Sequence, residues 1–167
     1  MSNQIIVGIS DFKVAHSPDT LVTYALGSCI GISLYDKKSG IGGLAHIILP
    51  ESSVNQDVLT KDDRKKFADT AVVQLLEEML RAGADREQIT ARIVGGANMF
   101  KIPVSYTTSK IGMIAERNID AVRTELKRLG IPLIGEDIGG DYGRTVFFYL
   151  ETGRIMVQSL IKGTKEL

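Results

Sequence analysis

The chain has 167 residues, with 20 Lys and Arg, 20 Asp and Glu, and one cysteine. This length is typical of one domain with its own core, so we expect a single domain over residues 1–167. The balanced charge argues against a nucleic-acid-binding surface, and one cysteine excludes an internal disulfide. No apolar run approaches the roughly 18 residues of a membrane span, so we expect no membrane insertion. The opening MSNQIIVGISDFK lacks the features of a signal peptide, which predicts a cytoplasmic protein.

Alternating apolar residues predict the strands of the first half. QIIVGIS and LVTYALG are typical of two strands that open the fold. The stretch from Ile30 to Tyr35 also alternates, then DKKSG supplies a turn and IGGLAHIIL returns, which predicts a hairpin. Chain reversal would bring Cys29, at the start of one hairpin strand, towards His46 on the other.

Helical spacing begins in the middle of the chain. A stripe of apolar residues follows Thr60, which together with Asp63 resembles a capping box, and Gly83 is typical of a helix stop. ITARIVGG predicts a strand, RNIDAVRTELKRLGIP a second helix and RTVFFYLETGRIMVQ a closing hairpin. We therefore predict an α+β fold, a layered α/β/β-type sandwich with a mostly antiparallel sheet core and helices packed on it.

Cys29 has two interpretations. A lone cysteine in an intracellular protein is often a small buried hydrophobe. Gly27 and Ser28 precede this one and Gly31 follows it, so the thiol lies where a turn meets a strand, with little bulk around it. Such a turn can leave backbone N–H groups at Gly27 and Ser28 free to hold the oxyanion that forms when a thiol attacks a carbonyl.

His46 is the candidate base for this thiol. In its apolar surroundings a core histidine bonded to a carbonyl is an equal alternative. A neighbouring imidazolium would lower the pKa of the thiol and favour the nucleophilic thiolate. Thr23 can accept from the ring N–H and orient the ring, although the residue pattern alone favours an ordinary strand threonine. His16 is the competing base, but Ser17, Pro18 and Asp19 predict an exposed turn there.

Metal and phosphate sites are not expected. Two histidines and one cysteine are a poor zinc set, and Glu136, Asp137 and Asp141 are too few for a calcium loop. The glycine-rich stretches VGGANMF and EDIGGDYGR lack the spacing of a phosphate-binding loop, so we expect turns and close backbone packing there. We predict no cofactor.

Several separated motifs together resemble the chemoreceptor glutamine deamidase family, CheD. They are ALGSCIGISLYD, GGLAHIILP, GGANMF, IGMIAERNIDAV and GEDIGGDYGR, and they span nearly the whole chain. The resemblance implies that Cys29 is the nucleophile, His46 its base and Thr23 the third member of a triad. It further implies a protein-glutamine glutaminase that converts glutamine side chains on bacterial chemoreceptors to glutamate, with release of ammonia.

The resemblance also implies a partner. In many bacteria members of this family bind CheC, the phosphatase of phosphorylated CheY. We would expect that contact at Met99 and Phe100, although both residues are equally typical of a core. Two alternatives to the deamidase remain: another Cys-His amidase or transglutaminase, and a regulatory module of chemotaxis that binds without catalysis.

Overall fold

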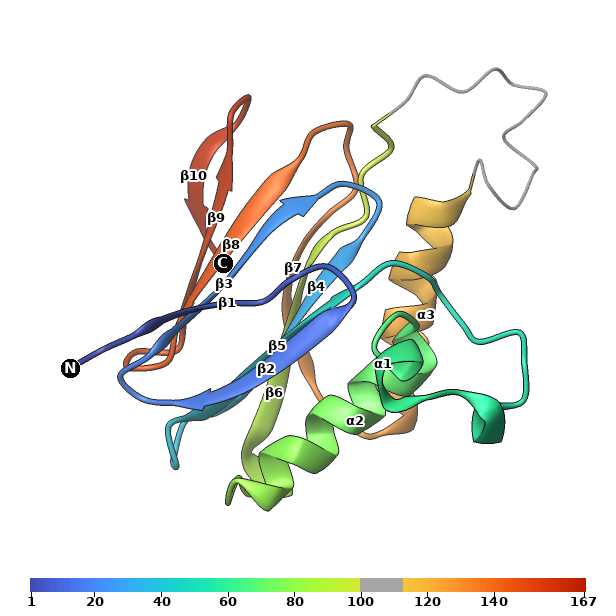
Figure 1. Ribbon diagram of the computed structural model, residues 1–167. Helices are drawn as coiled ribbons and strands as arrows, with labels where there is room; N and C mark the ends of the chain where they lie inside the picture. The colour runs from blue at the N-terminus through green and yellow to red at the C-terminus, as the bar shows by residue number, and fades with distance from the viewer. Residues whose placement is uncertain (100–112) are drawn as a thin grey trace.

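The chain folds into two stacked five-stranded sheets with its long helices on one side (Figure 1). The computed structural model describes residues 1–99 and 113–167. Sheet A has the strand order β1-β3-β8-β9-β10, and sheet B has the order β2-β5-β4-β6-β7. The strands are β1 (Gln4–Ile6), β2 (Asp11–His16), β3 (Thr20–Leu26), β4 (Ile30–Asp36), β5 (Ile41–Ile47), β6 (Ile89–Gly95), β7 (Leu133–Ile138), β8 (Arg144–Tyr149), β9 (Arg154–Ser159) and β10 (Gly163–Glu166).

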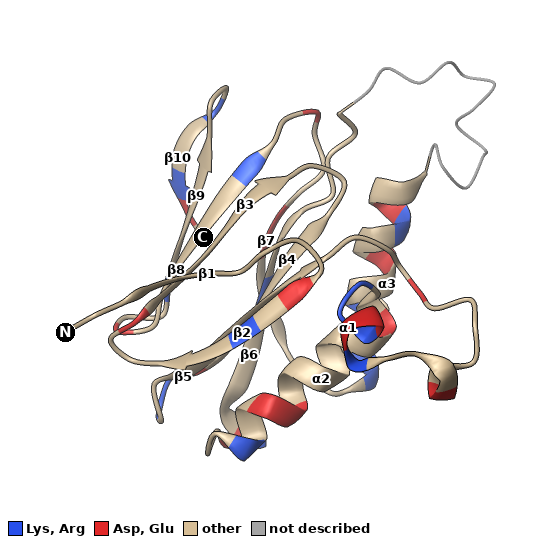
Figure 2. Cartoon of the chain, in the orientation of Figure 1, with Lys and Arg blue, Asp and Glu red and all other residues tan. Residues whose placement is uncertain are grey.

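The helices cover the face of sheet B that points away from sheet A (Figure 1). They are α1 (Lys61–Arg64), α2 (Ala68–Arg81) and α3 (Ile114–Arg128), with short 3-10 turns η1 (Gln56–Val58) and η2 (Arg86–Gln88). Both basic and acidic residues occur on α1, α2 and α3 (Figure 2), so these helices present mixed charge to solvent. This arrangement confirms the predicted α+β sandwich.

The central strands of sheet B are buried on both faces, and their side chains alternate between two cores. Every residue of β4 and β5 is buried. Ile32 and Ala45 belong to a core shared with the helices, whereas Tyr35 and Leu44 belong to a second core between the two sheets. Because side chains alternate along a strand, each residue of this hairpin can be assigned to the helix side or the inter-sheet side.

The predicted hairpin of β4 and β5 is confirmed. The two strands pair antiparallel, with Gly31 opposite His46 and Asp36 opposite Ile41. The predicted strand over ITARIVGG is β6, the predicted second helix is α3, and the closing hairpin is formed by β8 and β9. The elements that carry the candidate site residues were therefore predictable from apolar alternation.

Other elements differ from the expectation. The capping box at Thr60 and Asp63 is present, but the helix it starts ends at Arg64, and a separate helix begins at Ala68. Between them the Lys66 carbonyl accepts from the N–H groups of Ile48 and Leu49, which pulls this segment out of helical bonding. Three strands, β2, β7 and β10, were not predicted, and β1 with β3 and β6 with β7 pair in parallel.

Candidate active site

His46 lies on β5 and points into the space between the sheets. It is two residues from Leu44, which belongs to the inter-sheet core, so both side chains share that face. The side chain is fully buried. Its neighbour across the ladder is Gly31, and the side chains of Leu26 and Thr23 occupy the space over this glycine.

Thr23 on β3 of sheet A reaches the ring of His46 across the inter-sheet space. Thr23 Oγ1 lies 2.8 Å from His46 Nδ1 and 2.8 Å from the carbonyl oxygen of Val7. A carbonyl can only accept, so the single hydroxyl hydrogen is donated to Val7, and Oγ1 accepts from the ring N–H. The proton of a neutral His46 is therefore on Nδ1.

The second ring nitrogen of His46 is left available. His46 Nε2 is buried and has no hydrogen-bond partner among residues 1–99 and 113–167. With Nδ1 protonated, this nitrogen carries a lone pair. A buried acceptor without a partner is costly, which makes it a candidate for a function.

Cys29 lies just before β4, on the same side of the hairpin as His46. Side chains two residues apart along a strand lie on the same face, so Cys29 is on the face of Gly31. Gly31 is paired with His46 in the ladder of β4 and β5. Its partly buried side chain packs against the inter-sheet core, in agreement with this orientation. The predicted proximity of Cys29 and His46 therefore agrees with the register, and Thr23 faces the same space from sheet A.

The charge state of this pair differs from the expected thiolate and imidazolium. Burial raises the pKa of the Cys29 thiol above its ordinary value, and the backbone N–H of Cys29 opposes this only in part. Burial lowers the pKa of His46 to about 4. Both groups are thus neutral at neutral pH, because each charged form would lose its hydration in the inter-sheet space.

The loop that carries Cys29 is bound to the protein through its carbonyl groups. The Gly27 carbonyl accepts from the Ala97 N–H at 2.8 Å, and the Cys29 carbonyl accepts from the Gly96 N–H at 2.9 Å. The Ser28 carbonyl accepts from Asn118 Nδ2 at 2.9 Å. In residues 1–99 and 113–167 the N–H groups of Ser28 and Cys29 donate to no backbone carbonyl, and the Cys29 N–H instead contacts its own thiol.

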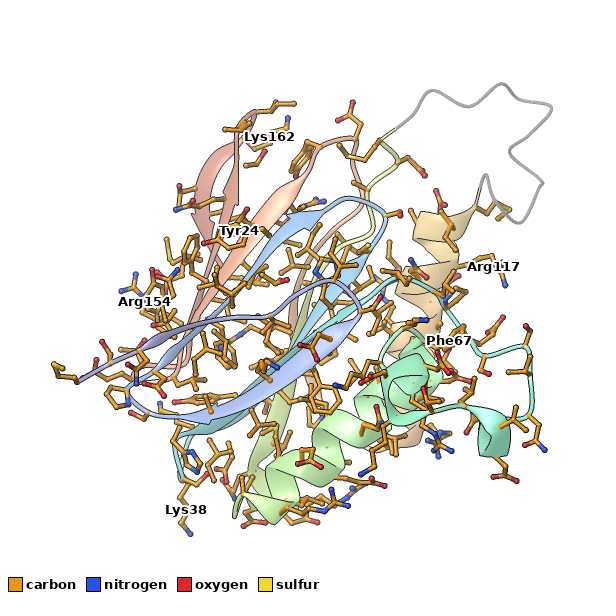
Figure 3. The ribbon with its side chains drawn as sticks, viewed as in Figure 1. Tyr24, Lys38, Phe67, Arg117, Arg154 and Lys162 are labelled. Atoms are coloured by element: carbon orange, nitrogen blue, oxygen red, sulfur yellow. The ribbon has the colours of Figure 1, made fainter. Side chains whose placement is uncertain are left out.

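A distorted stretch of β3 leads into this loop. The register with β8 shifts between Thr23 and Leu26, and Ala25 between them has a φ of 59°. Between these two pairings β3 has one residue more than β8, which is a β-bulge. Thr23 and Leu26 are therefore both fully buried, while Tyr24 points to the outer face of sheet A (Figure 3). This bulge therefore turns the chain towards Cys29 without moving Thr23 from the inter-sheet space.

Asn118 on α3 is a site residue that the sequence interpretation missed. It is fully buried, and its Nδ2 group donates both to the Ser28 carbonyl and, at 3.2 Å, to the Ile48 carbonyl. Its Oδ1 has no partner among the described residues. A signal was present, because Asn118 lies on the helix face of Ala115 and Val122, where a polar residue is unusual.

The remaining candidates lie away from the pair or near its edge. His16 is exposed. It lies at one end of the β2–β5 ladder, and His46, opposite Asp11, lies at the other end. Met99 is 47% exposed and lies over Gly27, while Phe100 falls outside the described residues. Met99 and Ala25 also line a surface hollow of about 600 Å³ that continues towards β9 and β10.

Comparisons with known proteins cover the whole chain. A family model described as "CheD chemotactic sensory transduction" matches residues 48–159. A "Probable chemoreceptor glutamine deamidase CheD" of Caldanaerobacter subterraneus subsp. tengcongensis is 45% identical over 99% of this chain and 99% of its own length. This chain belongs to the CheD family. A second CheD protein, named "Probable chemoreceptor glutamine deamidase CheD 2", from Geobacter metallireducens, is 47% identical over the full length of both chains.

The full-length CheD relatives extend the likeness over the candidate site. The family-model match begins after His46, so it does not include Thr23, Cys29 or His46. A crystal structure of the Neisseria meningitidis protein NMB0706 aligns with 82% of this chain and 63% of its own, at 10% identity and a TM-score of 0.43. That likeness is too weak to bear on the fold or the activity.

The described part of this CheD family member shows neither a cluster of metal ligands nor a membrane-spanning helix. Residues 1–99 and 113–167 contain no group of three His, Cys, Asp or Glu side chains placed to hold a metal ion. In the same ranges no helix is long and apolar enough to cross a membrane. The two glycine-rich stretches pack against each other, as expected, since the Gly139 N–H donates to the Gly95 carbonyl and the Asn98 N–H to the Gly140 carbonyl.

Proposed function

We propose that this protein hydrolyses the side-chain amide of glutamine residues on chemoreceptors, giving glutamate and ammonia. Membership of the CheD family supports the reaction class, since the relatives carry the name chemoreceptor glutamine deamidase. The observation that carries the proposal is the Thr23 hydroxyl bond to His46 Nδ1, because it leaves Nε2 as an unprotonated base. A cysteine that shares the face of that base has the position of a nucleophile.

The first half-reaction forms a thioester. The sulfur of Cys29 attacks the glutamine amide carbon while its proton moves to His46 Nε2. Since both groups start neutral, this transfer accompanies the attack rather than preceding it. The carbonyl oxygen becomes an oxyanion held by the N–H groups of Ser28 and Cys29. The imidazolium then protonates the departing nitrogen, the carbon–nitrogen bond breaks and ammonia leaves.

The second half-reaction releases glutamate. His46 Nε2 removes a proton from a water molecule, whose oxygen attacks the thioester carbon. The oxyanion forms again at the same N–H groups, and its collapse breaks the carbon–sulfur bond. The imidazolium returns its proton to the sulfur, which restores the thiol of Cys29. The reaction needs no group beyond the chain and water.

Mass spectrometry of the receptor tests this proposal. After incubation with the protein, the receptor should gain the mass of amide-to-acid conversion at specific glutamines, without chain cleavage. Cys29→Ala and His46→Ala should each lower the rate on the order of 10⁴-fold or more. Tyr24→Ala, which changes an exposed side chain on the outer face of sheet A, is the matched control and should retain activity.

The same measurement separates the rival functions. Clipped receptor peptides would indicate a peptidase, and amine adducts at glutamine would indicate a transglutaminase. Full receptor modification by Cys29→Ala would rule out catalysis by this thiol. A purely regulatory module would leave receptor glutamines unchanged under all conditions.

A second role in binding CheC is part of the proposal. The exposure of Met99 beside the Cys29 loop supports a contact there. A partner seated over Gly27 would also cover the approach to Cys29, so CheC should inhibit deamidation. Deamidation rates measured with and without CheC, for the wild type and Met99→Ser, test this: Met99→Ser should weaken the inhibition.

A further inference from the structure

Asn118 belongs to a motif, IGMIAERNIDAV, whose residues have no part in the proposed chemistry. Arg117, one position earlier on α3, points away from the sheets and pairs with Glu51 (Figure 3). Asn118 is instead fully buried, and its side-chain amide contacts two segments far away in the sequence. A buried polar side chain on a helix otherwise packed by apolar residues requires an explanation.

Asn118 connects the nucleophile loop to the strand that carries the base. Its Nδ2 group donates to the carbonyl of Ser28, next to Cys29, and to the carbonyl of Ile48, two residues after His46. Two carbonyl acceptors also fix the orientation of the amide, since the opposite orientation would place Oδ1 against both of them. One side chain thus holds the two segments of the candidate site at a fixed separation.

The bond to Ser28 also fixes the direction of a donor. In a trans peptide unit the carbonyl and the following N–H point in opposite directions. The only cis bond among the described residues is Ser17–Pro18, so the unit of Ser28 and Cys29 is trans. With the Ser28 carbonyl held towards α3, the Cys29 N–H must point away from the helix. It contacts its own thiol, which is the side on which an attacked carbonyl would lie.

We infer that Asn118 is a positioning residue that sets the oxyanion-binding orientation of the Cys29 N–H by holding the Ser28 carbonyl. This inference rests on the proposed function. Without the Nδ2 donor, the peptide unit of Ser28 and Cys29 loses the one hydrogen bond that residues 1–99 and 113–167 give to its carbonyl, so it can rotate. The donor to the oxyanion is then lost, while the thiol and His46 remain in place.

The test compares two rates: deamidation of the receptor, which passes through an oxyanion, and alkylation of the Cys29 thiol, which does not. Asn118→Leu keeps a similar volume but has no donor. We expect kcat for receptor deamidation to fall about 10²–10³-fold, the effect of losing one oxyanion donor, with KM little changed. Alkylation of Cys29 by iodoacetamide forms no oxyanion, so its rate should stay at the wild-type value.

Matched variants keep the test decisive. Val122→Ala removes a buried side chain one turn along the same face of α3 and should lower the melting temperature without lowering kcat. Wild-type kcat in Asn118→Leu would overturn the inference, as would a parallel fall in deamidation and alkylation. If Cys29→Ala still deamidates the receptor, catalysis by Cys29 is overturned, and the positioning role of Asn118 is overturned as well because it depends on that catalysis. If Cys29→Ala is inactive but Asn118→Leu is not, only the positioning role fails.

Discussion

The hydroxyl of Thr23 determines which nitrogen of His46 carries the proton. Its hydrogen is donated to the Val7 carbonyl, so it holds the proton of His46 on Nδ1 and leaves Nε2 free. The same burial that isolates this pair also keeps both Cys29 and His46 neutral. Both groups of the candidate site are thus neutral at rest, and in the proposed reaction charge would separate only when substrate is attacked.

The resting charge of Cys29 can be measured by ultraviolet absorbance of the thiolate. Because burial raises the pKa of Cys29 above the ordinary 9.0, the thiolate should be absent at neutral pH and appear only in alkaline solution. Cys29→Ala supplies the baseline. A thiolate signal at neutral pH that disappears in His46→Ala would contradict the neutral pair and support an ion pair instead.

Removal of the Thr23 hydroxyl should disturb the tautomer of His46. Thr23→Val leaves the buried Nδ1–H without an acceptor, at a cost of about 1–3 kcal/mol, so kcat/KM should fall about 10–100-fold. Nitrogen NMR of the ring should show a shift of the proton towards Nε2. Thr23→Ser retains the hydroxyl and should keep most of the activity; equal losses in both variants would argue against the hydroxyl bond.

At the scale of elements, the site is assembled from a rigid hairpin and a loop held from outside. His46 belongs to β5, which is paired on both sides within sheet B. Cys29 lies just before β4. Its loop packs directly against Gly95 and Gly96 at the end of β6, which have no side chains to prevent this contact. Gly95 has a φ of 120°, and a side chain there would lie 2.2 Å from the Cys29 carbonyl oxygen.

Gly95→Ala should therefore displace the Cys29 loop. The backbone conformation is strained for any residue with a side chain, and the added carbon must push the Cys29 carbonyl away, so deamidation should fall together with the melting temperature. Gly130→Ala is the control, since it has a φ of 70° but open space around it. It should destabilise the fold while keeping kcat. Wild-type activity in Gly95→Ala would show that the loop tolerates displacement.

Local patterns predicted the elements that carry or adjoin Thr23, Cys29 and His46, but not all of the contacts around these residues. Alternation of apolar residues in β4 and β5 was sufficient to predict the hairpin, whose register places Gly31, two residues after Cys29, opposite His46. The helix break before Phe67 was not predictable, because it depends on bonds to Ile48 and Leu49. β10 is exposed throughout and shows no apolar alternation. The contact of Asn118 with Ser28 joins residues 90 positions apart, which no local pattern reveals.

For the molecule as a whole, the buried base makes stability depend on pH. The pKa of His46 falls from 6.5 to about 4 on folding, so the unfolded chain binds more protons than the folded one between these values. Stability from this group is complete above pH 6.5 and declines as the pH falls towards 4. The sequence predicted two alternatives for His46, core residue or catalytic base, and its burial and free Nε2 are compatible with both at once.

Denaturant unfolding at several pH values tests this dependence. Between pH 6.5 and 4 the free energy of unfolding should fall by about 3 kcal/mol because of His46. His46→Gln cannot titrate, so its free energy of unfolding should vary less over the same range, whatever its absolute stability. Identical slopes for the two proteins would mean that His46 is protonated in the folded state at these pH values.

The burial of β4 and β5 on both faces has a consequence for thermal inactivation. Amide hydrogens of this hairpin are enclosed by α2 and α3 on one side and by sheet A on the other, so they exchange only when the entire domain opens. The Cys29 loop depends on three carbonyl contacts outside the strand ladder and can open alone. Warming would then move Cys29 away from His46 while the β-sandwich is still intact, and cooling would return the loop to its place without refolding.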